Sequence, residues 1–169
     1  MENTYEWKIA NNVQQVHLML LESDKKNALN GVIPQRNIKS TAYFVENDMV
    51  EILENKEGKI SAMYTLSLKP LFDTEVYKEE TPDIKAAYLC RLCVSPENEH
   101  DEYFTGIRSI KRAIERAKSY NCNRLRCEIN PDLVKVKQMF LLLDFKLYMD
   151  PSEQPGEKGL KKAFMQKEI

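Results

Sequence analysis

The sequence has no long apolar run, no excess of either charge and few residues that break secondary structure. None of its apolar stretches approaches the roughly 20 residues that a membrane helix needs. The opening MENTYEWKIANN has neither the cationic start nor the apolar core of a signal peptide. The formal net charge of −1 gives no electrostatic footprint for nucleic acid or for an anionic membrane surface. We therefore expect a cytoplasmic protein that binds neither.

Cysteines are also scarce, which bears on disulfides and metals. Four in a chain of 169 residues are too few for a disulfide framework and fit reduced thiols. Cys90 and Cys93 form a C-x-x-C pattern that Cys122 and Cys127 could complete as a zinc site. Residues three apart on a strand point to opposite faces, however, so the first pair cannot readily share a metal. We expect no metal site.

What the sequence does contain is a series of short periodic segments. Strands are predicted at 5–10, 49–53, 60–68, 86–94, 125–129, 146–149 and 159–169. Helices are predicted at 13–21, within 25–47, from 107 to 118, and from 131, where a proline suits a first turn, to 143. With 43% hydrophobic residues, the chain can bury the core of one domain, 1–169. The order predicts an α/β (α+β) fold with helices covering a sheet.

Three stretches in the second half form a more specific series. RLCVSPE precedes an amphipathic helix, LRCEIN follows that helix, and a further helix ends in LLLDFKLY. Together they resemble the GNAT superfamily of N-acetyltransferases, in which the fourth strand ends in Leu-x-Val-x-Pro, here Leu92 to Pro96. The tail AFMQKEI is similar to the family's final strand. The resemblance spans 49–169, extends to the rest only by element order, and implies a mixed, mostly antiparallel sheet of about seven strands flanked by about four helices.

The resemblance implies a site for acetyl-CoA (coenzyme A) at the fourth strand and the helix after it. In GNAT enzymes the fourth and fifth strands splay apart, and the pantetheine arm pairs with the exposed backbone of the fourth strand. The pyrophosphate lies at the start of the following helix, where backbone N–H groups face the anion. Some members also carry an asparagine at the end of the fifth strand. The corresponding residues here are Leu92, Cys93, Val94, Thr105, Gly106, Ile107 and Asn130. For Asn130, capping a helix before Pro131 is an equally good interpretation.

Three residues depart from the family's pattern. Its pyrophosphate loop reads Arg or Gln, two residues, Gly, one residue, then Gly or Ala, whereas the six residues here begin with Asp101 and carry Phe104 in place of the first glycine. Phe140 stands where many members have a tyrosine that protonates the departing sulfur. Charges about 4 Å apart interact by roughly 4 kcal/mol at an effective dielectric constant near 20. The acids of this loop would therefore weaken pyrophosphate binding, although acids at a helix start also suit the helix dipole.

Two functions remain open at this point. One is an N-acetyltransferase that moves an acetyl group from acetyl-CoA to a primary amine, on a small molecule or a peptide. The other is a non-catalytic GNAT-fold protein that has lost acetyl-CoA binding and acts as a binding or regulatory module. Catalytic residues are not identified, and a homodimer is compatible with either function. The acids of segment 73–83 either attract a cationic amine or form a solvated loop.

Overall fold

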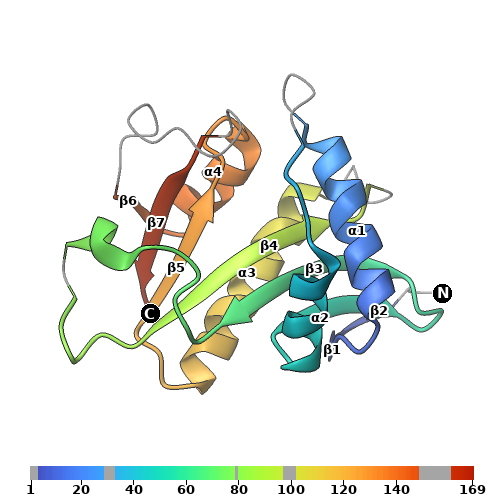
Figure 1. The fold of residues 1–169 in the computed structure, drawn as a ribbon, viewed down its shortest axis with the longest axis horizontal. Coiled ribbons are helices and arrows are strands. Elements are labelled where there is room, and N and C mark those ends of the chain that lie inside the picture. Colours follow the sequence, from blue (N-terminus) through green and yellow to red (C-terminus); the bar gives the residue numbers. More distant parts are fainter. Residues whose placement is uncertain (1–3, 29–32, 79, 97–101, 149–160) are drawn as a thin grey trace. The chain divides into compact units, whose positions relative to one another are not determined.

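The computed structural model describes residues 4–28, 33–78, 80–96, 102–148 and 161–169 (Figure 1). Its strands are β1 (Tyr5–Ile9), β2 (Val50–Asn55), β3 (Ile60–Ser67), β4 (Ala86–Val94), β5 (Arg124–Ile129), β6 (Lys146–Leu147) and β7 (Ala163–Glu168). Its helices are α1 (Val13–Lys26), α2 (Ile38–Glu46), α3 (Glu102–Ser119) and α4 (Val134–Leu142), with a 3-10 turn η1 (Thr74–Tyr77). The predicted element order and fold class are confirmed. Among the described residues, no helix is both long and apolar enough to cross a membrane.

The strand order is β1-β2-β3-β4-β5-β7-β6. The β4–β5 pair is parallel, and the β1–β2, β2–β3, β5–β7 and β6–β7 pairs are antiparallel. By contact density the chain forms two compact units. Unit 1 comprises residues 1–65 and 91–109, and unit 2 comprises 66–90 and 110–169.

Unit 1 is built around the β1–β2–β3 meander and the helices α1 and α2. Asn12 begins α1 by accepting a hydrogen bond from the N–H of Gln15, and Asn37 begins α2 in the same way through Lys39. The core is apolar side chains from the strands and both helices: Ala10, Val16, Met19, Leu20, Val45, Val50, Ile52, Ile60, Met63 and Cys93. Strand alternation puts Val50 and Ile52 on this face and turns Glu51 to the other.

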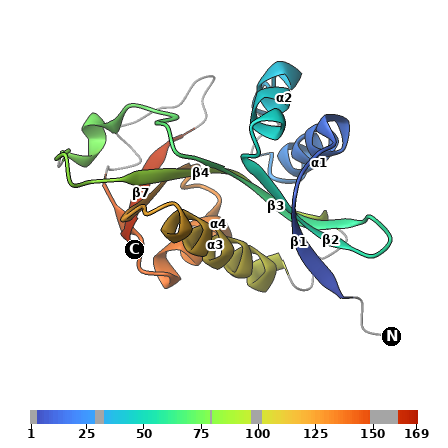
Figure 2. The ribbon, with the colours of Figure 1, turned by 90° about the horizontal axis from the view of Figure 1, so that it is seen from below.

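Unit 2 has a layer on each face of its strands. Figure 2 shows η1 on one face of β4 and β7, with α4 and the second half of α3 on the other. The α3 residues buried on that side are Ile110, Ala113, Ile114 and Ala117, as the predicted amphipathic pattern requires. On the η1 face, Phe72 packs against the rings of Tyr77, Tyr88 and Phe164. In the connection from β3 to β4, Phe72 and Tyr77 therefore cover the sheet, while the acids Asp73, Glu75, Glu80 and Asp83 are exposed to solvent.

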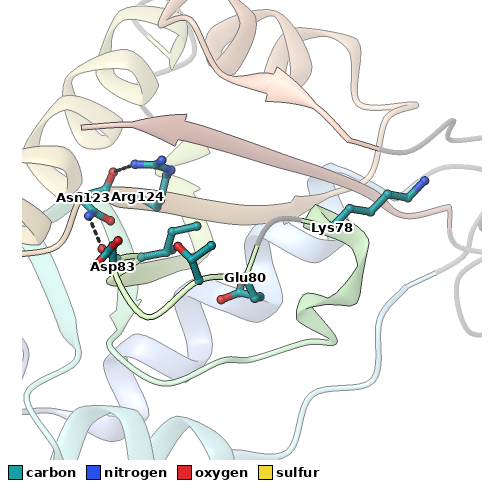
Figure 3. A pocket seen from close by; sticks show the side chains of 7 residues that line it. Lys78, Glu80, Asp83, Asn123 and Arg124 are labelled. Atoms are coloured by element: carbon teal, nitrogen blue, oxygen red, sulfur yellow. Dashed lines mark hydrogen bonds between the residues drawn. The ribbon is translucent and has the colours of Figure 1, made fainter.

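The same connection borders a shallow groove in unit 2 with a volume of about 510 Å³ (Figure 3). It is lined by Lys78, Glu80, Thr81, Asp83, Ile84, Asn123 and Arg124. The Asn123 side chain holds the backbone on one side of the groove. Its Nδ2 donates to the carbonyl of Asp83 at 2.7 Å, and its Oδ1 accepts from the N–H of Lys85 at 2.9 Å. The lining thus mixes two cations, Lys78 and Arg124, with two acids, Glu80 and Asp83.

Three predicted helix boundaries were wrong. Helix α1 ends at Lys26, five residues after the predicted end. Helix α3 begins at Glu102, five residues before the predicted start, and α4 begins at Val134 with Leu133 as its N-cap. Pro131 therefore precedes α4 instead of forming its first turn. The turn is set by Asn130, whose Oδ1 accepts from the N–H of Asp132 at 3.0 Å, and whose carbonyl accepts from the N–H of Leu133 at 3.1 Å. Residues 149 and 159–160 of the predicted final strands lie outside the described residues.

Candidate functional site

The first part of the predicted site is the second half of β4. The β4–β5 ladder joins Ala86–Leu89 to Arg124–Cys127 and ends there. Two residues later Arg91 has a left-handed φ of 53°, which breaks the regular strand. Its guanidinium donates to Thr41 Oγ1 at 3.1 Å and lies 4.9 Å from the centre of the Phe44 ring. An early end to the ladder is what the predicted splaying of the two strands requires.

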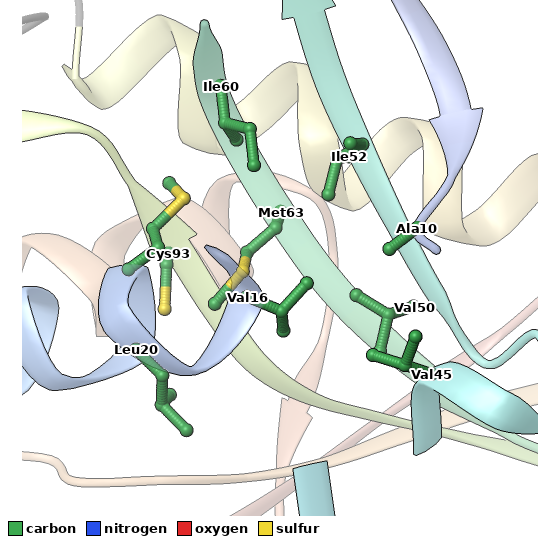
Figure 4. Packing of buried hydrophobic residues seen from close by; sticks show 10 residues of the cluster. Ala10, Val16, Leu20, Val45, Val50, Ile52, Ile60, Met63 and Cys93 are labelled. Atoms are coloured by element: carbon green, nitrogen blue, oxygen red, sulfur yellow. The ribbon is translucent and has the colours of Figure 1, made fainter. Parts of the chain in front are cut away.

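Beyond this break, Leu92 is half-buried, whereas Cys93 and Val94 are buried. The Cys93 side chain points into the core of unit 1 beside Leu20 and Met63 (Figure 4). The pKa of the Cys93 thiol is raised to about 11, mainly by burial and also by the nearby Asp24, against a hydrogen bond to Ser23 and the charges of Arg36 and Arg91. Cys93 is thus a neutral core thiol, and it can serve a ligand through its backbone alone.

We expect Cys93 and Cys127 to resist alkylation in the folded protein. Both are buried, and burial raises the pKa of each thiol, so little thiolate exists near neutral pH. Cys90 and Cys122 are half-buried and should react first with iodoacetamide at pH 8. Peptide mass mapping, with urea-unfolded protein as the control in which all four react, measures the order. Labelling of Cys93 as fast as Cys122 would contradict this placement.

The second part of the predicted site is the start of α3. Thr105, Gly106 and Ile107 are buried, while Phe104 is 62% exposed. Because α3 begins at Glu102, the N–H groups up to residue 104 precede the hydrogen-bond ladder of the helix. The N–H of Thr105 is the first within that ladder, as are those of the fourth residues of α1 and α2, Val16 and Thr41, which donate to the N-cap carbonyl. The N–H groups of Gly106 and Ile107 lie within the ladder as well. Arg108 brings a cation to the same turn and donates to Thr105 Oγ1 at 3.2 Å. Asp101 lies outside the described residues.

Asn130 and Phe140 belong to unit 2. The capping interpretation of Asn130 is wrong, since the N-cap of α4 is Leu133, without a side-chain hydrogen bond. Phe140 is 2% exposed and packs edge to face on Phe145, with ring centres 4.9 Å apart and an interplanar angle of 82°. Phe140 is therefore a core residue, and its ring has no proton to donate.

A polar cluster that the sequence did not reveal lies on the η1 face of unit 2. Its centre is Arg126 of β5, which is 1% exposed. Arg126 Nε donates to Gln166 Oε1 at 2.6 Å, and Nη1 donates to the Tyr88 hydroxyl at 3.0 Å and pairs with the Glu80 carboxylate. The register explains the meeting, because Tyr88, Arg126 and Gln166 lie opposite one another on β4, β5 and β7. Alternation with Leu125 and Cys127 reads as a solvated polar face, which is why sequence alone missed it.

No group of three metal-ligating side chains is present in the part of the chain that the structure describes, and none of the four cysteines forms a disulfide.

Comparison with solved structures identifies the fold. A GNAT acetyltransferase from Listeria monocytogenes superposes with a TM-score of 0.71 over 98% of this chain and 95% of its own, at 15% identity. YncA of Salmonella typhimurium, described as a putative acetyltransferase with its cofactor acetyl-CoA, superposes with a TM-score of 0.66. The match covers 98% of this chain and 94% of YncA, at 14% identity. A chain of the NatC complex bound to Gag peptide and CoA superposes with a TM-score of 0.71. The match covers 98% of this chain and 98% of that one, at 11% identity. The protein therefore has the GNAT fold. No family model and no curated protein matches its sequence.

Proposed function

We propose that the protein is an N-acetyltransferase that moves an acetyl group from acetyl-CoA to a primary amine, in the cytoplasm. The observation that carries the proposal is the GNAT fold over 98% of the chain, shared with structures described as holding acetyl-CoA or CoA. The early end of the β4–β5 ladder supports it, since the backbone of Leu92, Cys93 and Val94 lies beyond that ladder.

The described residues fit such a cofactor in their donor chemistry. Leu92–Val94 would offer strand backbone to the amides of the pantetheine arm. The N–H groups of residues 102–104 would face the pyrophosphate, with Thr105, Gly106 and Ile107 as the turn that follows and Arg108 as a cation. Asn130 completes the proposed set, although its Oδ1 is engaged by the N–H of Asp132.

Acetyl transfer does not require a proton donor at the position of Phe140. Acetyl-CoA supplies an acetyl thioester, whose carbonyl carbon bonds to the amine nitrogen as the C–S bond breaks, with the amine's proton passing to solvent or to the sulfur. A thiol has a pKa of about 8.5, so the thiolate can leave without a protein acid at some cost in rate. The buried phenylalanine is therefore compatible with a slow enzyme.

The test is amine-dependent release of the coenzyme A thiol. We expect turnover of acetyl-CoA with at least one acceptor from a panel of amino acids, polyamines, amino sugars and peptides, and mass spectrometry should find the product heavier by one acetyl group. Hydrolysis without an amine is the background control. Absence of both acetyl-CoA binding and transfer to any amine would instead favour the non-catalytic interpretation, in which acetyl-CoA binding is lost and Phe140 and the exposed Phe104 replace family residues that serve catalysis and cofactor binding.

A further inference from the structure

The starting observation is the cost of burying Arg126. Moving a guanidinium out of water costs several kcal/mol unless a counter-charge and hydrogen bonds replace the lost hydration. Two neutral groups, Gln166 and Tyr88, accept from it, and the ring of Tyr77 lies 4.2 Å from its Cζ. Burial raises the pKa of Tyr77, so the phenol stays neutral beside the cation. Among the described residues, Glu80 is the one ion-pair partner of Arg126.

The guanidinium is held rigidly but is not saturated. Gln166 is itself fixed, because its Nε2 donates to the Tyr148 hydroxyl at 3.1 Å, and Tyr77 is anchored by its hydroxyl donating to the carbonyl of Met165 at 3.2 Å. Arg126 Nη2, however, is buried without a hydrogen-bond partner in the described part of the chain. Glu80 meets Nη1 alone, so the two-pronged pairing that a carboxylate and a guanidinium prefer is incomplete.

Glu80 differs from the other members of the cluster in its setting. Its side chain is 46% exposed, it comes from the connection that covers the sheet rather than from a strand, and it also lines the groove of unit 2. That groove carries the cations Lys78 and Arg124 beside the acids Glu80 and Asp83. A lining of both signs suits a ligand that bears an amine and a carboxylate together.

We propose that Arg126 is a carboxylate-binding residue, and that Glu80 occupies its position until the carboxylate of a ligand displaces it. The ligand is then a molecule that carries both a carboxylate and an amine, such as an amino acid or a peptide with a free carboxyl terminus. The proposal goes beyond the acetyltransferase function. The carboxylate site itself is a property of unit 2, independent of acetyl-CoA.

The experiment is rescue of Glu80→Gln by an added carboxylate. Removing the Glu80 charge leaves Arg126 buried without its ion pair, so the variant should melt at a lower temperature than the wild type. Benzoate should restore the loss, and isothermal titration should show it binding at least about tenfold more tightly to Glu80→Gln than to the wild type. Benzamide, which has the same shape without the charge, should do neither.

Glu168→Gln is the matched control. Glu168 forms an ion pair with Arg124, which lies on β5 like Arg126. The Glu168 side chain is 79% exposed, so benzoate should not act on this variant. Arg126→Lys keeps the positive charge but removes the paired N–H donors of the guanidinium. In a Glu80→Gln background it should therefore abolish the benzoate effect. Should the lysine variant fail to fold, the comparison of Glu80→Gln with Glu168→Gln still decides.

Equal effects of benzoate and benzamide, equal rescue of both glutamine variants, or no response of Glu80→Gln would each overturn the proposal and leave Arg126 a purely structural arginine. Because these titrations contain no acetyl-CoA, their failure is distinct from failure of acetyl transfer.

Discussion

Replacing Phe140 with alanine is expected to lower the free energy of unfolding by about 3–5 kcal/mol, the range for phenylalanine-to-alanine changes in cores. Phe140 is 2% exposed, and its edge-to-face contact with Phe145 joins α4 to the segment before β6. Alanine removes the ring and leaves a cavity that the buried neighbours can only partly close. Urea denaturation followed by circular dichroism measures the loss.

The matched control is Leu142→Ala, two residues along the same helix. Leu142 is 60% exposed, so its truncation should change stability by less than about 0.5 kcal/mol. Equal effects of the two substitutions would mean that Phe140 is not in the core. Phe140 would then be a surface residue, and a purely structural role for it would no longer hold.

Replacing Arg36 with methionine is expected to cost about 3 kcal/mol, because it leaves the buried carboxylate of Asp24 without its partner. Arg36 Nε and Nη2 donate to the two oxygens of Asp24 at 2.8 and 2.9 Å. The side chains are 24% and 9% exposed. Breaking a fully buried pair from one side costs about 3–5 kcal/mol, and the remaining exposure of Arg36 places this pair at the lower end. Urea denaturation again gives the difference.

A double-mutant cycle with Asp24→Asn is the control for that prediction. Once the carboxylate is gone, Arg36→Met should cost much less, so the two changes should be strongly non-additive. Additive costs would show that Arg36 and Asp24 contribute independently, against the two-pronged geometry. The pair also bears on β4, because both charges act on the thiol of Cys93.

The sequence predicted elements well where one local signal dominates. The bounds of β4 follow from an apolar run that ends at Pro96, and the α3 face follows from Ile107, Ile110, Ile114 and Ala117 at helical spacing. The start of α4 was wrong because Pro131 is a typical first-turn residue, whereas Asn130 forms a turn with its own side chain and delays the helix.

Features that depend on contacts distant in sequence were not predictable in this way. Arg126 alternates with apolar residues on β5, which normally indicates a solvent face. It is buried because Phe72 and Tyr77, some fifty residues earlier, pack over that face. The same connection brings Glu80 to Arg126. The acidic stretch that suggested a cationic acceptor therefore belongs to a region with charges of both signs.

The most direct test of the central claim is a thermal-shift titration with acetyl-CoA. At a hundred times its dissociation constant, a ligand stabilises the folded state by about 2.7 kcal/mol, and each kcal/mol moves the midpoint of a domain this size by roughly 2–4 °C. The account predicts a saturable shift of that order at millimolar acetyl-CoA, and a larger one for the double variant Asp101→Arg, Phe104→Gly, which brings the helix start closer to the family's pattern. No shift in either folded protein would contradict acetyl-CoA binding at β4 and α3, and with it the proposed acetyltransferase function.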